Sequence, residues 1–183
     1  MKKVLLFSIF FFIFSALGAF AYQTILIDWP SGSRWNVGYY EKVGNEAILQ
    51  YVPAGETSSN WTRTLIVHSY RDSDYASTQL SSMLTRLMMV QNPTSNYKYY
   101  KYSPEDTIAV RSTSNYNGIQ AQCEILRVAK AQEGQISIQY IDRNKSHFMK
   151  TYSAWYKIVR DARTYSSYYM DERVMNKAES YEL

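Results

Sequence analysis

The sequence predicts an α+β domain, in which an antiparallel sheet of about six or seven strands carries two helices on one face. Three patterns support this fold class. Several segments alternate apolar and polar residues, as half-buried strands do, and short turns join them into antiparallel pairs. Two longer segments place apolar residues three and four positions apart, which is the spacing of one helical face. Their order predicts about three strands, a helix, about four strands and a second helix.

Three strands are expected before the first helix. Gly44-Asn45 separates two alternating segments and is typical of a tight hairpin turn. The third segment begins at Trp61, after a polar loop, and is rich in residues that favour strands, namely Thr, Ile, Val and Tyr. The expected strands cover residues 35–43, 47–52 and 61–70, and an apolar lead-in before them covers residues 22–29.

The first helix is the most regular segment of the sequence. Its apolar residues recur three and four positions apart over residues 76–88. Ser73 or Asp74 is expected to cap its start, and Asn92-Pro93 is expected to end it. The expected inner face of this helix consists of Ala76, Leu80, Met83, Leu84, Leu87 and Met88.

The alternating pattern returns after this helix. Gly134 is expected to turn the last two strands into a hairpin, and a second helix is expected from about Phe148 to Arg163. Both helices should cover one face and leave the Tyr-rich and Gln-rich side of the sheet open to solvent or a partner. The expected strands cover residues 97–102, 107–112, 119–129 and 135–140.

The chain is expected to have three parts. Residues 1–21 form an apolar run that follows Lys2 and Lys3 and ends in small residues, which predicts a bacterial signal peptide cut before Tyr22. An uncleaved anchor is the alternative, because the run approaches a spanning length. The first residue after the expected cut is Tyr22 and not Cys, and no second long apolar run occurs, so we expect a soluble, exported protein without a stable membrane anchor. Residues 22–163 form a single domain, and residues 164–183 form a polar, Tyr-rich tail.

Composition and charge exclude some classes of function. The chain carries a formal charge of +4, and loss of Lys2 and Lys3 with the leader would lower it by two. So small a charge argues against nucleic acid as a partner. The single cysteine, Cys123, cannot form an internal disulfide. It shares an alternating face with Ile119 and Ile125, so we expect a buried, unreactive thiol.

One short segment resembles a known group of proteins. Residues 51–56 read Y-x-P-x-G-E, and residues 60–62 read N-W-T. This pattern, within residues 40–130, resembles small exported proteins of unknown function from Gram-negative bacteria. The order of elements is similar to that of Mog1/PsbP-like proteins, which pair an antiparallel sheet with flanking helices. These resemblances imply an exported α+β protein and imply no particular activity.

Motifs that carry chemistry are missing from the sequence. It contains no G-x-S-x-G, H-E-x-x-H, P-loop or G-x-G-x-x-G pattern. The chain has only two histidines, and neither stands at a metal-ligand spacing, so we predict no catalytic residue, no metal site and no cofactor. A secreted hydrolase that uses carboxylates with His68 is one alternative. A secreted effector that acts on a host is another.

Aromatic residues give the leading functional prediction. The chain has 18 tyrosines, and several of them cluster around Lys98 and Lys101. We therefore predict a periplasmic or secreted binding module that uses a Tyr-rich surface to bind a protein or a glycan. Strand alternation should place Lys98, Tyr100 and Tyr102 on one side and Tyr97, Tyr99 and Lys101 on the other. The sequence leaves the oligomeric state open. The candidate binding residues are Tyr97, Tyr99, Tyr100, Tyr102, Trp61 and Glu56.

Overall fold

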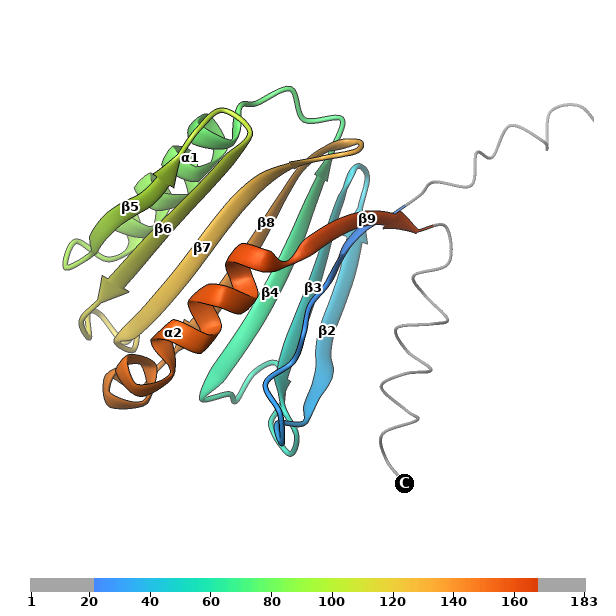
Figure 1. Ribbon diagram of the computed structural model, residues 1–183. Coiled ribbons are helices and arrows are strands. Elements are labelled where there is room, and N and C mark those ends of the chain that lie inside the picture. Colours follow the sequence, from blue (N-terminus) through green and yellow to red (C-terminus); the bar gives the residue numbers. More distant parts are fainter. Residues whose placement is uncertain (1–21, 168–183) are drawn as a thin grey trace, which may run out of the picture.

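The computed structural model describes residues 22–167 (Figure 1). The expected signal peptide and residues 168–183 of the expected tail lie outside the described residues. In the part that is described, no helix is long and apolar enough to cross a membrane.

A seven-stranded antiparallel sheet forms the centre of the fold. Strands that follow one another in the chain are joined as hairpins, with one exception. After the third strand of this sheet, the chain passes through the first helix and crosses from the middle of the sheet to its edge. The expected α+β class and the expected order of elements are confirmed. Across the sheet the strands are β2 (Trp35–Val43), β3 (Glu46–Pro53), β4 (Arg63–Arg71), β8 (Gly134–Asp142), β7 (Gln122–Ala131), β6 (Asp106–Thr113) and β5 (Asn96–Tyr102).

A second, two-stranded sheet joins the two ends of the described chain. It pairs β1 (Tyr22–Leu26) with β9 (Arg163–Ser167) in antiparallel register. Ile25 of β1 is buried in the main core. The sequence predicted an apolar lead-in for β1 and only a polar tail from residue 164, so β9 was missed. Such a short polar strand owes its conformation to its pairing partner, which local sequence does not reveal.

The two helices cover opposite faces of the sheet, so the expectation that both cover one face is wrong (Figure 1). They are α1 (Ser77–Gln91) and α2 (Lys145–Asp161). Ile125 of β7 belongs to the core under α2, whereas the next residue, Leu126, packs against Leu80 of α1. Successive side chains of a strand point to opposite faces. Because β7 is apolar on both faces, each face needs a cover of its own.

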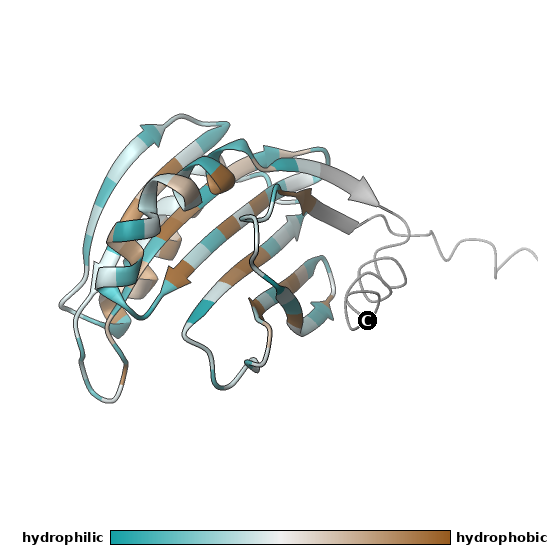
Figure 2. Cartoon of the chain, turned by 60° about the horizontal axis from the view of Figure 1, so that its bottom comes forward, coloured by the Kyte–Doolittle hydropathy of each residue, from teal (hydrophilic) through white to brown (hydrophobic). Residues whose placement is uncertain are grey.

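The core under α2 is aromatic. Trp155 stacks on Tyr140 of β8, with ring centroids 4.0 Å apart, and its edge meets Trp35 of β2 at 5.3 Å. Phe148 and Val159 complete the buried face of the helix. Figure 2 shows hydrophobic and hydrophilic residues in alternate bands along several strands, as expected where the two faces of a strand differ in polarity.

Helix α1 buries a polar stripe and exposes an apolar one. Ser77, Ser81 and Thr85 face the sheet, and the Ser77 hydroxyl donates to Oε1 of Gln135 at 2.8 Å. Met83 and Leu87 are exposed by half, so the prediction that they belong to the inner face is wrong. Leu80 and Met88 are buried on the same face, and the hydroxyls of Ser81 and Thr85 have no hydrogen-bond partner among the described residues. The helix begins after Ala76, whose backbone N–H donates to Gln79, and not at Ser73 or Asp74.

Candidate functional site

The predicted tyrosine cluster lies on β5, the edge strand of the main sheet. A β-bulge between Tyr99 and Lys101 shifts the register of this strand. The expected alternation fails there, because the extra residue turns the rest of the strand over. Tyr102 therefore joins Tyr97 and Tyr99 rather than Tyr100. The rings of these three residues touch in sequence, at 5.6 and 4.8 Å, and the Tyr102 hydroxyl lies 3.4 Å from Oγ of Ser82 in α1.

Tyr100 lies on the other side of the strand. Its ring meets Tyr156 of α2 at 5.8 Å, and the Lys98 ammonium sits 5.1 Å from its centroid. Burial, followed by a hydrogen bond with Tyr100, raises the pKa of Tyr152 to about 12. The four predicted tyrosines thus belong to two different surfaces, one beside each helix.

The tyrosines on the α1 side share a side of the sheet with large exposed side chains of that helix. We call these tyrosines and the exposed side chains of the helix together the α1–β5 surface. Each of its members is a large apolar or aromatic side chain that is at least 42% exposed. Helix α1 packs on β7 and β6, and its Ser82 approaches Tyr102 of β5, so both sets lie on the same side of the sheet. The α1–β5 surface consists of Met83, Leu87, Met89, Val90, Tyr97 and Tyr102.

Trp61 and Glu56, the other predicted residues, lie in the loop between β3 and β4 and belong to a separate site. Glu56 accepts hydrogen bonds from the backbone N–H of Thr62 at 2.7 Å and from its hydroxyl at 2.6 Å. Trp61 contacts the guanidinium of Arg143, whose Cζ lies 3.6 Å from the ring centroid. The Arg143 guanidinium also donates from Nη1 to the Trp61 carbonyl at 2.8 Å. These two residues shape a loop that positions an arginine.

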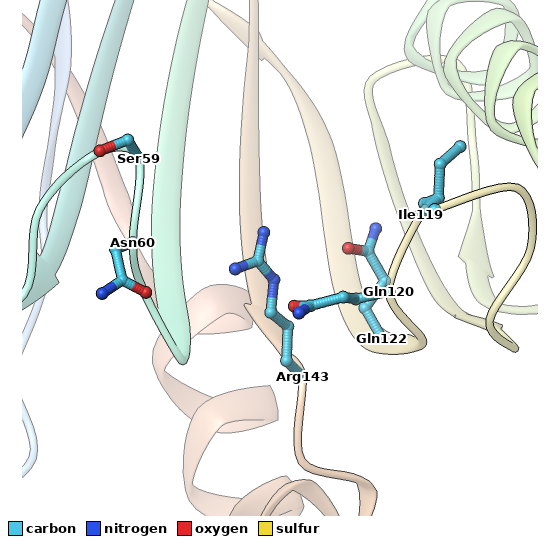
Figure 3. Close-up of a pocket in the computed structure, with 7 residues that line it drawn as sticks. Ser59, Asn60, Ile119, Gln120, Gln122 and Arg143 are labelled. Atoms are coloured by element: carbon cyan, nitrogen blue, oxygen red, sulfur yellow. The ribbon is translucent and has the colours of Figure 1, made fainter.

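Arg143 lines a polar pocket of about 360 Å³ (Figure 3). The pocket is formed by the β3–β4 loop, the β6–β7 loop with the first residue of β7, and the residue that follows β8. Nε of Arg143 is buried and has no hydrogen-bond partner among the described residues. Burial lowers the pKa of this guanidinium, against the opposing field of Glu56. The lining residues are Ser59, Asn60, Gly118, Ile119, Gln120, Gln122 and Arg143.

A buried charge network lies directly behind the pocket. Glu124 of β7 is 1% exposed and forms an ion pair with Arg111 of β6, which is 3% exposed. The Glu124 carboxylate also accepts from the amide of Gln139 at 2.8 Å and from that of Gln122. Because Gln122 lines the pocket, the network fixes the orientation of one of its walls. Sequence analysis missed this site, since its parts are brought together only by the sheet.

His68, the histidine of the hydrolase alternative, has a carboxylate partner but lies outside the Arg143 pocket. His68 bonds through Nε2 to Glu46 at 2.9 Å and stacks on Tyr70, which packs against α1. Burial lowers the pKa of His68, and Glu46 opposes that shift. Cys123 is buried in the core under α2, as predicted, and burial raises its thiol pKa. Among the described residues, the pocket lining includes no carboxylate and no histidine.

A second histidine takes part in a cluster that sequence analysis did not find. The fully buried carboxylate of Asp142 accepts from the Tyr140 hydroxyl at 3.1 Å and bonds to Nδ1 of His147. The other ring nitrogen of His147 lies 3.4 Å from Nη1 of Arg63. Both ring nitrogens therefore have partners, and the cluster ties β4 and β8 to the first turn of α2.

Comparison with known proteins places the chain in a family. Residues 31–166 match the model of an uncharacterised bacterial protein family. The chain belongs to this family. The family range begins before β2 and ends within β9, so it includes both helices, the α1–β5 surface and the Arg143 pocket. No curated protein matches the chain by sequence.

Proposed function

We propose that this protein works by binding another protein through the α1–β5 surface. The observation that carries the proposal is the exposure of its six large side chains, from 42% for Met89 to 75% for Val90. Large apolar side chains gathered on one side of a protein are costly to leave in water, and on folded proteins such surfaces mark sites of interaction. Burial of this surface against a partner would remove the cost.

The composition of the α1–β5 surface favours a protein over a glycan. Sugar rings stack on aromatic side chains but need polar groups beside them. Here the other exposed members of the surface, on α1, are Met, Leu and Val side chains, and the α1 group next to the Tyr102 hydroxyl is the hydroxyl of Ser82. Methionine and tyrosine are enriched at protein interfaces, where they adapt to the partner and bury large areas.

The position of β5 supports the same proposal. An edge strand presents backbone groups that no neighbouring strand satisfies, and a partner can add a strand there. The bulge after Tyr99 and the two lysines of β5 are devices that discourage unspecific pairing. A specific partner would gain both backbone pairing and the apolar contacts of α1.

We also propose that the protein is exported by its leader, into the periplasm or beyond it, in Gram-negative bacteria. The expected cleavage precedes Tyr22, and β1 begins at that residue, so the cut would leave the described fold whole. From the order of its strands and helices we further propose a similarity to Mog1/PsbP-like proteins. N-terminal sequencing of the mature product tests the cut, and a product that keeps Met1 would contradict it.

Site-specific photo-crosslinking tests the binding proposal. A photoreactive residue placed at Leu87 or Tyr102, in the full chain made in its own bacterium, should give the same discrete adduct from both positions. Met149 of α2 provides the control, because it is 66% exposed and lies on the opposite face. Adding Met83→Lys should weaken the adduct. Equal adducts from all three positions, or none from Leu87 and Tyr102, would overturn the proposal.

A further inference from the structure

We propose that the Arg143 pocket binds the carboxylate group of a small polar ligand. The pocket is separate from the α1–β5 surface, and the inference does not rest on the proposed function. It follows from one cation, the neutral groups around it, and the rigidity of the walls.

Arg143 is held in place but lacks a counterion. The Trp61 ring supports one face of the guanidinium, and the Trp61 carbonyl accepts one of its donors. The backbone N–H of Arg143 donates to the Thr62 carbonyl at 3.0 Å. Across residues 22–167, no carboxylate lies within ion-pair distance of this arginine. Glu56, whose field acts on it, is engaged by Thr62.

An unpaired guanidinium in a half-buried pocket attracts an anion. Partial burial has already removed some of its water, and its buried Nε has no acceptor. The planar fork of arginine matches a carboxylate, which accepts two parallel hydrogen bonds from it. A phosphate carries more charge than one arginine balances, and the lining offers no second cation. The geometry therefore favours a singly charged carboxylate.

The other residues that line the pocket indicate which groups the rest of the ligand carries. Amide side chains come from Asn60, Gln120 and Gln122, and a hydroxyl comes from Ser59. Gln122 donates its N–H to Glu124, so its carbonyl oxygen remains as an acceptor. Such a lining suits a ligand with its own hydroxyl or amide groups, such as a sugar acid or the last residues of a peptide. The volume of about 360 Å³ falls in the range of roughly 300–1,000 Å³ found for small-molecule sites.

Both walls of the pocket are pre-organised. In the β6–β7 loop, Tyr116 and Ile119 exchange backbone hydrogen bonds of 3.0 and 2.8 Å around a turn at Asn117 and Gly118, whose φ angles are positive. In the β3–β4 loop, Asn60 exchanges backbone bonds with Thr57 at 3.2 Å. Loops that are already ordered lose little conformational entropy when a ligand binds.

Titration with defined carboxylates tests the proposal on the full chain. The probes are glucuronate with glucose as its neutral match, and trialanine with its C-terminal amide. Amide chemical shifts report the location of binding, and calorimetry reports the affinity. We expect saturable shifts at Ser59–Asn60 and Gly118–Gln122 for at least one carboxylate and not for its neutral match. Preference for glucuronate indicates a free sugar acid as the source, and preference for trialanine indicates a peptide terminus.

Two variants connect the binding to the pocket. Arg143→Met should weaken binding of the carboxylate by about 10- to 100-fold, because it removes a hydrogen bond to a charged group. Arg160 is an exposed arginine of α2, and Arg160→Met should leave the affinity unchanged. Gln120→Glu places a negative charge, the same sign as that of the ligand, at the exposed rim of the pocket with nearly the same side-chain shape. It should also weaken binding of the carboxylate, and it provides the test if Arg143→Met fails to fold. Absence of binding by every probe, equal binding of the neutral probes, stronger binding of inorganic phosphate, or affinity unchanged in Gln120→Glu would each overturn the proposal.

Discussion

The guanidinium of Arg143 lies over the indole ring of Trp61, with its Cζ 3.6 Å from the ring centroid. The two residues are 82 positions apart in the sequence and belong to different loops. A cation–π contact of this kind stabilises a structure by about 0.5–2 kcal/mol, depending on how dry the site is. Here it also fixes the direction of the arginine relative to the pocket.

The Trp61–Arg143 contact predicts a measurable coupling. In a double-mutant cycle of Trp61→Leu with Arg143→Met, the coupling free energy should be about 0.5–2 kcal/mol, because each single change already removes the contact. Urea unfolding of the four proteins measures it. Trp61→Phe keeps an aromatic face and should retain part of the coupling. Strictly additive losses would show that the stacking contributes nothing to stability.

Two leucines of α1 should respond in opposite ways to truncation. Leu80 is 4% exposed and packs on Leu126, so Leu80→Ala should lower the free energy of unfolding by about 2–5 kcal/mol. Leu87 is 54% exposed, so Leu87→Ala should change it by less than about 0.5 kcal/mol. Thermal melts of the two variants compare them directly. Similar losses would mean that Leu87 is buried, as the sequence pattern first predicts.

Breaking the ion pair of Arg111 and Glu124 should lower the free energy of unfolding strongly, whereas replacing both partners with apolar residues should lower it much less. Glu124→Gln leaves a buried guanidinium without its counterion, and the expected loss of stability is about 3–5 kcal/mol. Replacing both partners, in Arg111→Met with Glu124→Leu, should recover much of that loss because no charge remains buried. Chemical denaturation measures both. A double variant less stable than the single one would contradict this account.

Cys123 should react slowly with thiol reagents in the native protein. The side chain is 7% exposed, and burial raises its pKa, so little thiolate is present near neutral pH. The labelling rate should increase sharply when denaturant exposes the thiol. Because the folded state holds the neutral thiol, its contribution to stability should decline as the pH rises past the ordinary thiol pKa. Fast labelling of the native protein would show that the site is open.

Local patterns predicted most of the elements correctly. The turn at Gly44-Asn45 joins β2 to β3, and the change of period near residue 76 marks α1. Both signals come from residues close in sequence, and the backbone geometry that they report is local. The burial of Cys123 also followed from alternation with its neighbours.

Alternation failed where one residue changed the register. The bulge between Tyr99 and Lys101 moved Tyr102 from the expected side of Tyr100 to the side of Tyr97 and Tyr99. Whether a bulge forms depends on the pairing with β6, so it cannot be read from β5 alone.

The sequence by itself determined the α+β class, the order of elements from β2 to α2, and the alternation that divides most strands between two faces. Only the tertiary structure decided that α1 and α2 cover opposite faces, and that Trp61, Gln122 and Arg143 meet at one pocket. The reason is that periodicity shows which side chains of an element share a face. Which other element packs on that face depends on contacts between residues far apart in the sequence. The apolar residues on both faces of β7, Ile125 and Leu126 among them, were the one local sign that two covers were needed.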